Sequence, residues 1–309
     1  MTPPAQPILV TGATGRVGGV GRHVASELIS RGLPVRAFVH RIDDRSEALQ
    51  RMGIEVVAGD FTDYPSLLAA LENVQAAYFS YPVGAGLTEA AGFFAAAGRE
   101  CGLHRVVDLS LDAAFPESPS PQGRAEWVAE QIFEWAGYGG AHLRVAAFFM
   151  ENLLTLYARQ IRERGEIRNS FGDFAPSWIA ASDVGAVGAA LLADPASITD
   201  RTTVVGAAER ADHATVAAII SEATGHPVRY HALTRDEWRD ELVASAAAAG
   251  RTDTTVAAHQ SAQSAALREH NTHLVTDDIV RLTGRPAVTL REFLASNRDA
   301  FLPDRATAP

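Results

Sequence analysis

The first residues with a chemical use form a glycine-rich loop directly after a short apolar segment. Residues 7–11 (PILVT) run into GATGRVG, and a helical pattern begins at about Val20. This order predicts a dinucleotide-binding turn, because Gly12 permits the tight turn and Gly15 lets the backbone approach a pyrophosphate. The following helix offers N–H groups to the phosphates. The residues predicted to bind the cofactor here are Gly12, Thr14, Gly15, Arg16, Val17 and Gly18.

The glycines continue beyond this loop as Gly18-Gly19-Val20-Gly21, an apparent three-residue extension before the helix. The third glycine of such a fingerprint allows the helix to pack closely on the strand. The spacing from Gly15 favours Gly18 as this third glycine, and Gly21 is the alternative.

The end of the second strand indicates which dinucleotide is bound. Sites for NAD usually place Asp or Glu there, where a carboxylate accepts hydrogen bonds from the ribose hydroxyls. Here the strand ends in His40 and Arg41, and a guanidinium suits a 2′-phosphate through bidentate hydrogen bonds. NADP(H) is therefore favoured over NAD(H), although Asp43 and Asp44 keep NAD(H) open.

Two further strand ends carry candidate site residues. Asp60 and Phe61 follow the third strand and are expected to bracket the adenine, with an N-cap as the alternative role of Asp60. Ser80 and Tyr81 lie at the end of the fourth strand and are expected to contact the cofactor. Tyr81 is also a candidate proton donor, with simple packing at a strand end as its alternative.

The chain contains no lysine: all 27 of its Lys and Arg residues are arginine. A Schiff base and a PLP-binding lysine are therefore excluded, as is the GxxxxGK[ST] loop that binds nucleoside triphosphates. Arginine stays protonated and cannot replace lysine as a tunable base. A coding bias explains the pattern equally well, but the chemical exclusion holds in either case.

The remaining composition is that of an ordinary globular enzyme. Hydrophobic residues make up 47% of the chain, and the net charge of −10 disfavours nucleic acid and anionic membranes as partners. The single cysteine, Cys101, cannot form an internal disulfide, and the start of the chain lacks a signal-peptide pattern, so we expect a cytoplasmic protein. His142, His231 and His259 show no ligand spacing, and no metal site is predicted.

These loops require strands and helices that alternate along the first half of the chain. Apolar strand patterns cover residues 7–11, 35–39, 54–58, 76–80, 105–110 and 141–146, with helical patterns between them. The alternation predicts an α/β fold with a doubly wound parallel sheet, the Rossmann fold. We place the nucleotide-binding domain at residues 1–150 and a smaller substrate or cap portion at 151–309, with some chain crossing between them.

The pattern is weaker after residue 150. Short strands are predicted at residues 178–181, 202–205 and 228–232, and Asp183 is predicted to cap the N-terminus of a helix. Residues 234–270 are predicted to be mostly helical, as a mobile cap or as a pair of helices.

Several segments together resemble the NmrA-like group of atypical short-chain dehydrogenases/reductases. They are TGATGRVGG, VRAFVHR, EVVAGDFTD, RVVDLS, LRVAAFFMEN, IAASDVGAVGAALL and the C-terminal NTHLVTDDIVRLTGRPAVTLREFL. The resemblance covers about Ile8 to Phe293 and implies an NAD(P)-binding domain with a smaller C-terminal portion that shapes a substrate cleft. It also implies either a reductase of quinones, enones or related electrophiles, or a cofactor-binding redox sensor.

The resemblance also indicates where catalytic residues would lie. Ser110 ends the fifth strand, at the position of the family's serine, and Glu126 and Glu130 stand where typical short-chain dehydrogenases have Tyr-x-x-x-Lys. Two carboxylates cannot reproduce a tyrosine activated by lysine, so carbinol oxidation by the usual mechanism is disfavoured. Ser110 and Glu126 remain catalytic candidates, with a structural serine and a solvated helix face as the alternatives.

The resemblance places the segment containing Phe148 and Asn152 in the substrate cleft, although this chain has Leu143-Arg144-Val145 where the family often has LRP. Two functional hypotheses follow. One is an NADP(H)-dependent reductase of a small apolar electrophile such as a quinone, enone or imine. The other is a non-catalytic redox sensor that acts through a protein partner. For assembly, a homodimer is kept as an alternative to the monomer.

Overall fold

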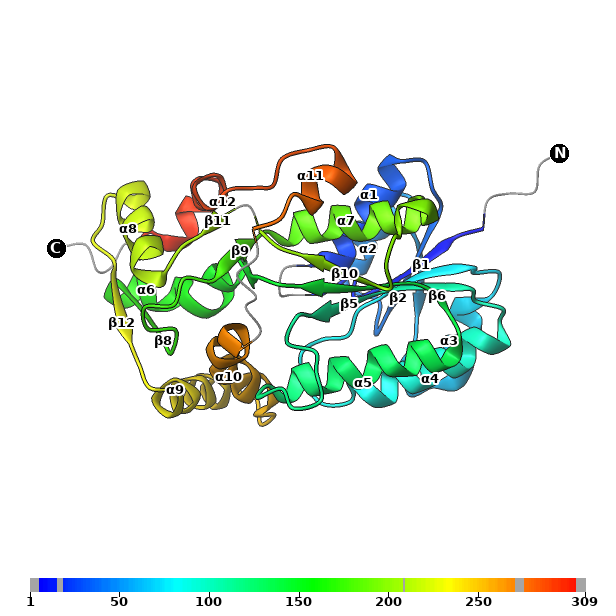
Figure 1. Ribbon diagram of the computed structural model, residues 1–309, viewed down its shortest axis with the longest axis horizontal. Coiled ribbons are helices and arrows are strands. Elements are labelled where there is room, and N and C mark those ends of the chain that lie inside the picture. Colours follow the sequence, from blue (N-terminus) through cyan, green and yellow to red (C-terminus); the bar gives the residue numbers. More distant parts are fainter. Residues whose placement is uncertain (1–5, 16–18, 208, 270–274, 304–309) are drawn as a thin grey trace.

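The computed structural model describes residues 6–15, 19–207, 209–269 and 275–303 (Figure 1). Its centre is a sheet of seven parallel strands in the order β10-β6-β5-β4-β1-β2-β3. Helices cover both faces of the sheet, which explains the nearly continuous apolar sequences of its central strands. The strands are β1 Ile8–Thr11, β2 Val35–Val39, β3 Glu55–Ala58, β4 Ala76–Phe79, β5 Arg105–Leu111, β6 Gly139–Val145 and β10 Thr202–Val205.

The helices form one layer on each face of this sheet (Figure 1). One apolar core, around Val24 and Tyr78, fills the first face, and another, around Phe79 and Phe94, fills the second. The doubly wound α/β fold predicted from the sequence is confirmed. The first layer contains α1 (Val20–Ser30), α2 (Asp44–Arg51), α7 (Ala181–Ala193) and α11 (Asp278–Thr283), and the second contains α3 (Tyr64–Leu71), α4 (Leu87–Glu100) and α5 (Pro121–Ala136).

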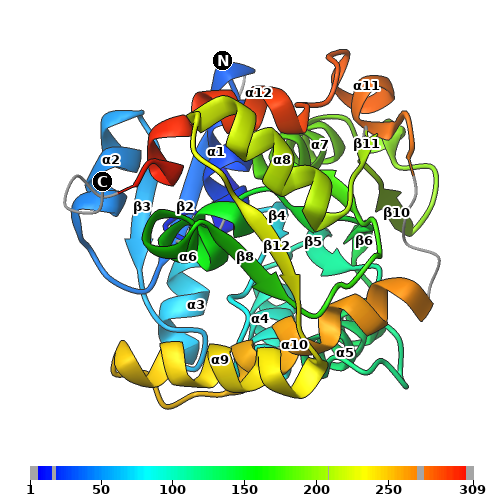
Figure 2. The same cartoon turned by 90° about the vertical axis from the view of Figure 1, so that its left-hand side faces the viewer.

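A smaller portion lies beyond the carboxyl ends of the strands, and Figure 2 views the molecule from that side. A third apolar core around Phe148, Tyr157 and Trp178 holds it together. Its two small sheets are β11-β9-β7 and β12-β8, made of β7 Phe148–Phe149, β8 Glu166–Asn169, β9 Ser177–Ile179, β11 Glu209–Arg210 and β12 Arg229–Ala232. Its helices are α6 (Ala158–Arg164), α8 (His213–Thr224), α9 (Arg235–Ala248), α10 (Thr255–Glu269) and α12 (Leu290–Ser296).

Three irregular turns complete the backbone. A π-helical turn covers Leu153–Tyr157, and short 3₁₀ turns cover Pro195–Ser197 and Arg298–Phe301. None of the helices in the described ranges is both long and apolar enough to cross a bilayer.

The chain returns from the smaller portion to the central sheet. β10 pairs with β6 as an edge strand, and α7 packs on α1, although both elements lie beyond residue 150. The expected crossing of the chain thus falls at these two elements, while the boundary at residue 150 itself stays a prediction.

Predicted and observed elements agree closely in the first half of the chain, where α1 begins at the predicted Val20 and β2 has the expected bounds. One predicted helix cap is wrong. α7 begins at Ala181 after the N-cap residue Ala180, and the Asp183 carboxylate instead accepts the backbone N–H of Val288 at 2.8 Å. Asp183 therefore joins α7 to the segment before α12 rather than starting the helix.

Residues 235–269 form a pair of helices, which is one of the two predicted alternatives. α10 packs on both α9 and α5, so it joins the two parts of the molecule (Figure 1). His259 Nδ1 lies 2.8 Å from Ser120 Oγ, at the N-terminus of α5. At the other end of α10, Arg268 donates to the carbonyl of Phe171 at 2.8 Å.

Candidate active site

The glycine loop lies at the carboxyl end of β1, where the strand order reverses. Gly12 has a φ of 70°, a left-handed conformation that favours glycine, and its carbonyl accepts the N–H of Gly15 at 3.0 Å. Thr11 Oγ1 accepts the N–H of Ser80 at 2.7 Å and donates to the Ser80 carbonyl at 2.9 Å. A Cβ on Gly12 would lie 3.0 Å from Ser80 Oγ. The structure therefore brings the predicted residues of β1 and β4 into contact.

The close packing of α1 on this loop depends on Gly21. A Cβ there would lie 2.5 Å from the Thr11 carbonyl oxygen and 2.9 Å from the Ala13 backbone nitrogen. The third glycine of the fingerprint, which allows the helix to pack closely on the strand, is therefore Gly21. The spacing in the sequence favours Gly18 for this role, with Gly21 as the alternative. Three predicted cofactor-binding residues lie outside the described residues and stay predictions: Arg16, Val17 and Gly18.

Within the described part of the chain, the N-terminus of α1 is suited to bind an anion. Its N-cap residue, Gly19, makes no side-chain cap, and the first turn of α1 carries no acidic residue. The N-terminus of α7 is already satisfied, because Glu151 accepts the N–H of Ala181 at 3.0 and 3.1 Å. The N–H groups and dipole of α1, together with the glycine cradle, therefore fit a pyrophosphate.

Two carboxylates near the ends of β2 and β3 already have hydrogen-bond partners. Asp43 is the N-cap of α2 and accepts N–H groups of its first turn. Asp60 accepts the N–H and the hydroxyl of Thr62 at 2.8 and 2.7 Å, and His40 Nδ1 lies 3.2 Å away. The bonds from Thr62 hold the pKa of Asp60 below its usual value. Both carboxylates are thus ionised and engaged with their own backbone.

Two arginines flank the same corner of the sheet. The Arg41 side chain is 67% exposed, with its Nε 3.7 Å from Asp43. Arg45 is held more firmly: it donates to the Thr14 carbonyl of the glycine loop at 2.6 Å and to Asp43 at 2.6 and 3.2 Å. Sequence reasoning missed Arg45, because it resembles any charge in the first turn of a helix. Only the fold brings it to Thr14.

Phe61 and Tyr81 belong to one aromatic cluster. Their ring centroids lie 5.5 Å apart, and Phe61 also contacts Phe38 and Phe79 at 5.4 and 5.6 Å. The Tyr81 hydroxyl donates to the Ala85 carbonyl at 3.3 Å, and burial raises the pKa of Tyr81. The cluster links the ends of β3 and β4, while the predicted cofactor contacts of both residues stay predictions.

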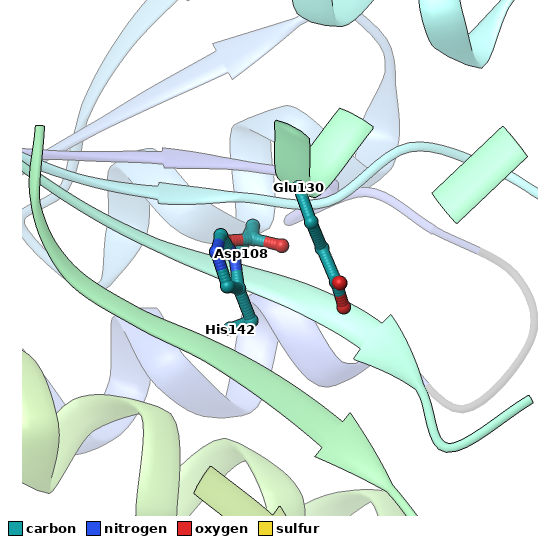
Figure 3. A group of neighbouring side chains, drawn as sticks. All are labelled: Asp108, Glu130 and His142. Atoms are coloured by element: carbon teal, nitrogen blue, oxygen red, sulfur yellow. The ribbon is translucent and has the colours of Figure 1, made fainter. Parts of the chain in front are cut away.

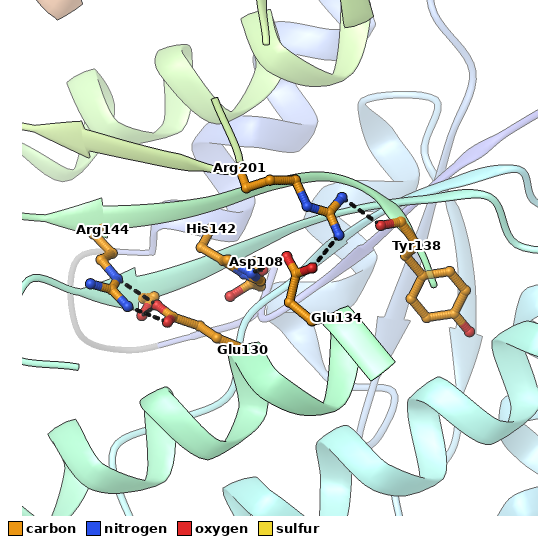
Figure 4. A network of polar contacts seen from close by, with 8 residues as sticks. Asp108, Glu130, Glu134, Tyr138, His142, Arg144 and Arg201 are labelled. Carbon is orange, nitrogen blue, oxygen red and sulfur yellow. Dashed lines mark hydrogen bonds and ion pairs between the residues drawn. The ribbon is translucent and has the colours of Figure 1, made fainter. Parts of the chain in front are cut away.

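A polar layer separates α5 from the sheet (Figure 4). Arg144 donates two hydrogen bonds to Glu130, at 2.8 and 2.5 Å, and Ser110 donates to the same carboxylate at 2.6 Å. Helical spacing of four and strand spacing of two place these groups on facing surfaces. We call this set the α5 seam; it consists of Asp108 and Ser110 on β5, Gln122, Glu126, Glu130 and Glu134 on α5, and His142 and Arg144 on β6.

His142 joins two carboxylates of the α5 seam. Its Nδ1 lies 2.7 Å from Asp108 and its Nε2 lies 3.0 Å from Glu134, which also accepts a 2.5 Å bond from Arg201. Burial alone lowers the pKa of His142, but the bonded Asp108, with help from Glu134, raises it to about 9. His142 is therefore a cation at neutral pH.

Asp108, Glu130 and His142 are close enough to suggest a metal site, since their ligand atoms lie within 4.8 Å of one another (Figure 3). Their existing partners do not fit one. A protonated His142 offers no lone pair to a metal, and Glu130 is bound in bidentate fashion by Arg144. We therefore assign these residues to the ion pairs of the α5 seam.

Glu126 differs from the other glutamates of the α5 seam. It accepts a hydrogen bond from Gln122 at 2.8 Å and, within the described residues, forms no ion pair. Burial raises its pKa to about 8, with a further contribution from the Asp108 and Glu130 charges and an opposing one from Gln122. With only 8% of its surface exposed, Glu126 is a buried neutral acid at pH 7.

Glu126 is linked through Gln122 to the loop that follows β4. Gln122 accepts the N–H of Gly84 at 3.2 Å, and Gly84 lies in the loop that begins at Ser80 and includes Tyr81. Ser110 has no exposed surface, and its hydroxyl is directed at Glu130. The structure thus links Glu126, through Gln122, to the loop that contains Tyr81, and it directs Ser110 into the α5 seam.

The segment predicted to line the substrate cleft is buried. Phe148 is fully buried, with the rings of Phe171 and Trp178 at 5.1 and 5.2 Å. Asn152 is 4% exposed and directly precedes the π-helical turn, a wide turn often found at functional sites. Phe148 supports this segment from the core, and the contact of either residue with a substrate stays a prediction.

A hollow of about 400 Å³ lies on the other face of the molecule, between α7 and α12. The walls of this hollow combine ionisable side chains (His23, Glu151 and Glu292) with apolar ones (Val288 and Phe293). Burial raises the pKa of Glu151 to about 7. The hollow belongs to the layer of α1 and α7 and does not adjoin the α5 seam.

Comparisons with known proteins agree with this geometry. Residues 4–112 match the NmrA-like family. The chain is 32% identical over 296 residues to the NAD(P)H azoreductase of Xenophilus azovorans, covering 95% of this chain and 99% of that one. It is 31% identical to the (4-alkanoyl-5-oxo-2,5-dihydrofuran-3-yl)methyl phosphate reductase of Streptomyces griseus, covering 96% and 100%. A solved Escherichia coli NADPH-dependent quinone oxidoreductase, complexed with NADPH, has a TM-score of 0.79 at 20% identity, covering 94% and 99%.

The fold and the glycine loop together define a protein of the Rossmann class, and both relatives that match nearly the whole chain are reductases. The chain belongs to the NmrA-like family of atypical short-chain dehydrogenases/reductases, since a 32%-identical relative matches it over nearly its full length. The family resemblance seen in the sequence is thus confirmed. Glu126 and Glu130, which the sequence predicts at the position of the usual Tyr-x-x-x-Lys, are both buried, and Glu130 is ion-paired with Arg144.

Proposed function

We propose that the protein is an NADP(H)-dependent reductase of a small conjugated electrophile, such as a quinone, enone, imine or azo compound. The position of Glu126 carries the proposal: a neutral carboxylic acid is tied through Gln122 to the loop after β4, at the carboxyl edge of the sheet. Two reductases that match nearly the whole chain, one of them an azoreductase, support the substrate class.

The preference for NADP(H) is supported by the charges at the end of β2. The Asp43 and Asp60 carboxylates are occupied by their own helix and turn, so they are poor acceptors for ribose hydroxyls. Arg41 is exposed, and Arg45 is held against the glycine loop. A 2′-phosphate between these guanidiniums would find charge-assisted hydrogen bonds.

When bound, NADPH supplies the hydride. The residues of the chain must hold the two reactants in line, exclude water and provide a proton. Glu126 carries its proton at pH 7, so it can donate to the oxygen or nitrogen anion that hydride addition leaves on the substrate. Tyr81 retains its proton because burial raises its pKa, and we assign it to packing beside the cofactor.

Turnover by the full-length protein tests this function. NADPH and NADH are each mixed with quinones, enones, imines and azo compounds, and the loss of reduced-nicotinamide absorbance is followed. Glu126→Gln keeps the shape of the neutral acid but cannot transfer its proton, so we expect kcat to fall about 10²- to 10⁴-fold with unchanged NADPH affinity. Glu117→Gln, at an exposed glutamate before α5, is the matched control with unchanged kcat.

Two outcomes would contradict parts of the proposal. NADPH binding without turnover across the whole panel would reject the reductase and favour a redox sensor. Equal kcat in Glu126→Gln and the wild type would retain the reductase and remove Glu126 as the proton donor.

A further inference from the structure

The α5 seam contains two ion pairs with the same orientation relative to Glu126. Asp108 is bound to His142 at 2.7 Å, and Glu130 is bound to Arg144 at 2.8 and 2.5 Å (Figures 3 and 4). Asp108 lies on β5 and Glu130 lies one turn after Glu126, whereas both cations come from β6. In the strand order β6-β5-β4, the cations are therefore on the side away from the β4 loop to which Glu126 is tied.

The charges of the α5 seam, counted together with Arg201 on Glu134, balance only if Glu126 is neutral. An ionised Glu126 would be a further carboxylate without a cation, in a site removed from water, and such a charge is costly. The balanced groups are the carboxylates of Asp108, Glu130 and Glu134 and the cations of His142, Arg144 and Arg201.

Other neighbouring groups do not supply a compensating charge. Tyr78 of β4 has a buried hydroxyl without a hydrogen-bond partner in the described structure, and burial raises its pKa. His259 of α10, bonded to Ser120 at the start of α5, is neutral because burial lowers its pKa to about 4. Burial is thus the main cause of the raised pKa of Glu126, and the carboxylates of Asp108 and Glu130 are the charges that add to it.

We propose that Asp108 and Glu130 are positioning residues of the reductase, because the anionic ends of their ion pairs keep the proton on Glu126 until a substrate anion takes it. This inference rests on the proposed role of Glu126. Hydride addition leaves an anion on the substrate, the O–H bond of Glu126 breaks, and an O–H or N–H bond of the product forms. The resulting carboxylate is repelled by both neighbours and recovers its proton from water.

The protonation of Glu126 can be measured without turnover, by infrared spectroscopy of the full-length protein during a pH titration. The difference spectrum between the wild type and Glu126→Gln assigns the C=O band of the neutral carboxyl. We expect this band to persist at neutral pH in the wild type. In Asp108→Asn its titration midpoint should fall by about one pH unit or more, because a like charge has been removed. The alkaline limb of the pH–rate profile should move in the same direction.

A second variant and a control separate this role from a structural one. Asp108→Asn also weakens the contact with His142, so Glu130→Gln, whose remaining oxygen can still accept from Ser110 and from Arg144 Nε, tests the same effect from α5. We expect the midpoint to fall in this variant too. Glu134→Gln removes a carboxylate of the α5 seam that does not act on Glu126, and its midpoint should stay at the wild-type value.

The proposal would be overturned by an unchanged midpoint in both test variants, or by a wild-type protein without the neutral band at pH 7. These readouts do not depend on turnover. An inactive protein with the expected band shifts would support the effect of Asp108 and Glu130 on the proton of Glu126 and would contradict the reductase function. An active enzyme with unchanged midpoints would contradict this inference alone.

Discussion

The sequence predicts the carboxyl group of Glu126 where short-chain dehydrogenases have their tyrosine, and the absence of lysine would make this replacement understandable. A tyrosine with a pKa near 10 needs a neighbouring cation to exchange its proton near neutrality. The ordinary pKa of a carboxyl group lies below neutrality, so it must be raised instead. Burial raises the pKa of Glu126 to about 8. A proton donor suited to neutral pH can therefore be built in this fold without a lysine.

The preference for one dinucleotide over the other depends on single arginines. We expect Arg41→Met to raise the Kd of NADPH about tenfold, the loss of one charge-assisted contact, and to leave the Kd of NADH unchanged. Arg45→Met should weaken both dinucleotides, because Arg45 also holds the Thr14 carbonyl in the glycine loop. Arg51→Met, at an exposed site on α2, is the control. Calorimetry measures the Kd of both dinucleotides in all three variants and the wild type, and an equal loss of affinity for both dinucleotides in Arg41→Met would exclude a 2′-phosphate contact.

Among the elements, α5 shows what the sequence could and could not predict. The sequence predicts a helical segment between the strands at residues 105–110 and 141–146, and α5 occupies Pro121–Ala136 there. Its charges at four-residue spacing, however, also fit a solvated face, and that alternative is wrong because Glu126 and Glu130 are buried. The partners Asp108 and Arg144 reach α5 only through the register of β5 on β6, which no local pattern contains.

The smaller portion was harder to predict for a related reason. Its strands are two to four residues long, and β7 and β11 are too short to show any alternation. They are stabilised by pairing with distant segments, such as β12 on β8, rather than by their own sequence. The β1, β2 and α1 unit, by contrast, has both local patterns and short connections, and its bounds followed from the sequence.

The contact between α1 and the glycine loop gives a prediction at the scale of elements. Gly21→Ala would force a methyl group against the Thr11 carbonyl and the Ala13 nitrogen, which are backbone atoms that cannot rotate away. We expect a loss of about 1–3 kcal/mol in the free energy of unfolding and weaker NADPH binding. In α4, Gly92 has open space at its Cβ position, so Gly92→Ala should be neutral or stabilise by about 0.5–1 kcal/mol. Urea unfolding measures both variants; equal effects would contradict the packing role of Gly21.

Over the whole molecule, buried ionisable groups link folding to pH. Besides Glu126 and His142, the core of the smaller portion contains His213, whose ring nitrogens have no partner in the described structure. Its ring lies 4.6 Å from that of Phe171 and 5.2 Å from that of Trp178, and burial lowers its pKa to about 3. Protonation therefore has opposite effects on the two parts of the chain.

The sign of each effect follows from the folded and unfolded pKa values. Glu126 and His142 have folded values of about 8 and 9, above the unfolded values of 4.5 and 6.5, so their stabilisation is lost as pH rises through the folded values. His213 has a folded value of about 3, below 6.5, so its stabilisation is lost as pH falls. We expect the free energy of unfolding to be highest between about pH 5 and 7.

Glu126→Gln isolates one of these groups across the whole pH range. The variant should match the wild type at about pH 5, where Glu126 is protonated in the folded protein, and should be more stable by on the order of 2 kcal/mol at about pH 9. Urea unfolding at several pH values measures the difference. Since the same substitution is expected to abolish proton transfer, stability would rise at alkaline pH as activity falls. If the free energy of unfolding changed with pH in the same way in both proteins, Glu126 would already be ionised at neutral pH. That result would contradict both its role as the proton donor and the raised pKa that its burial implies.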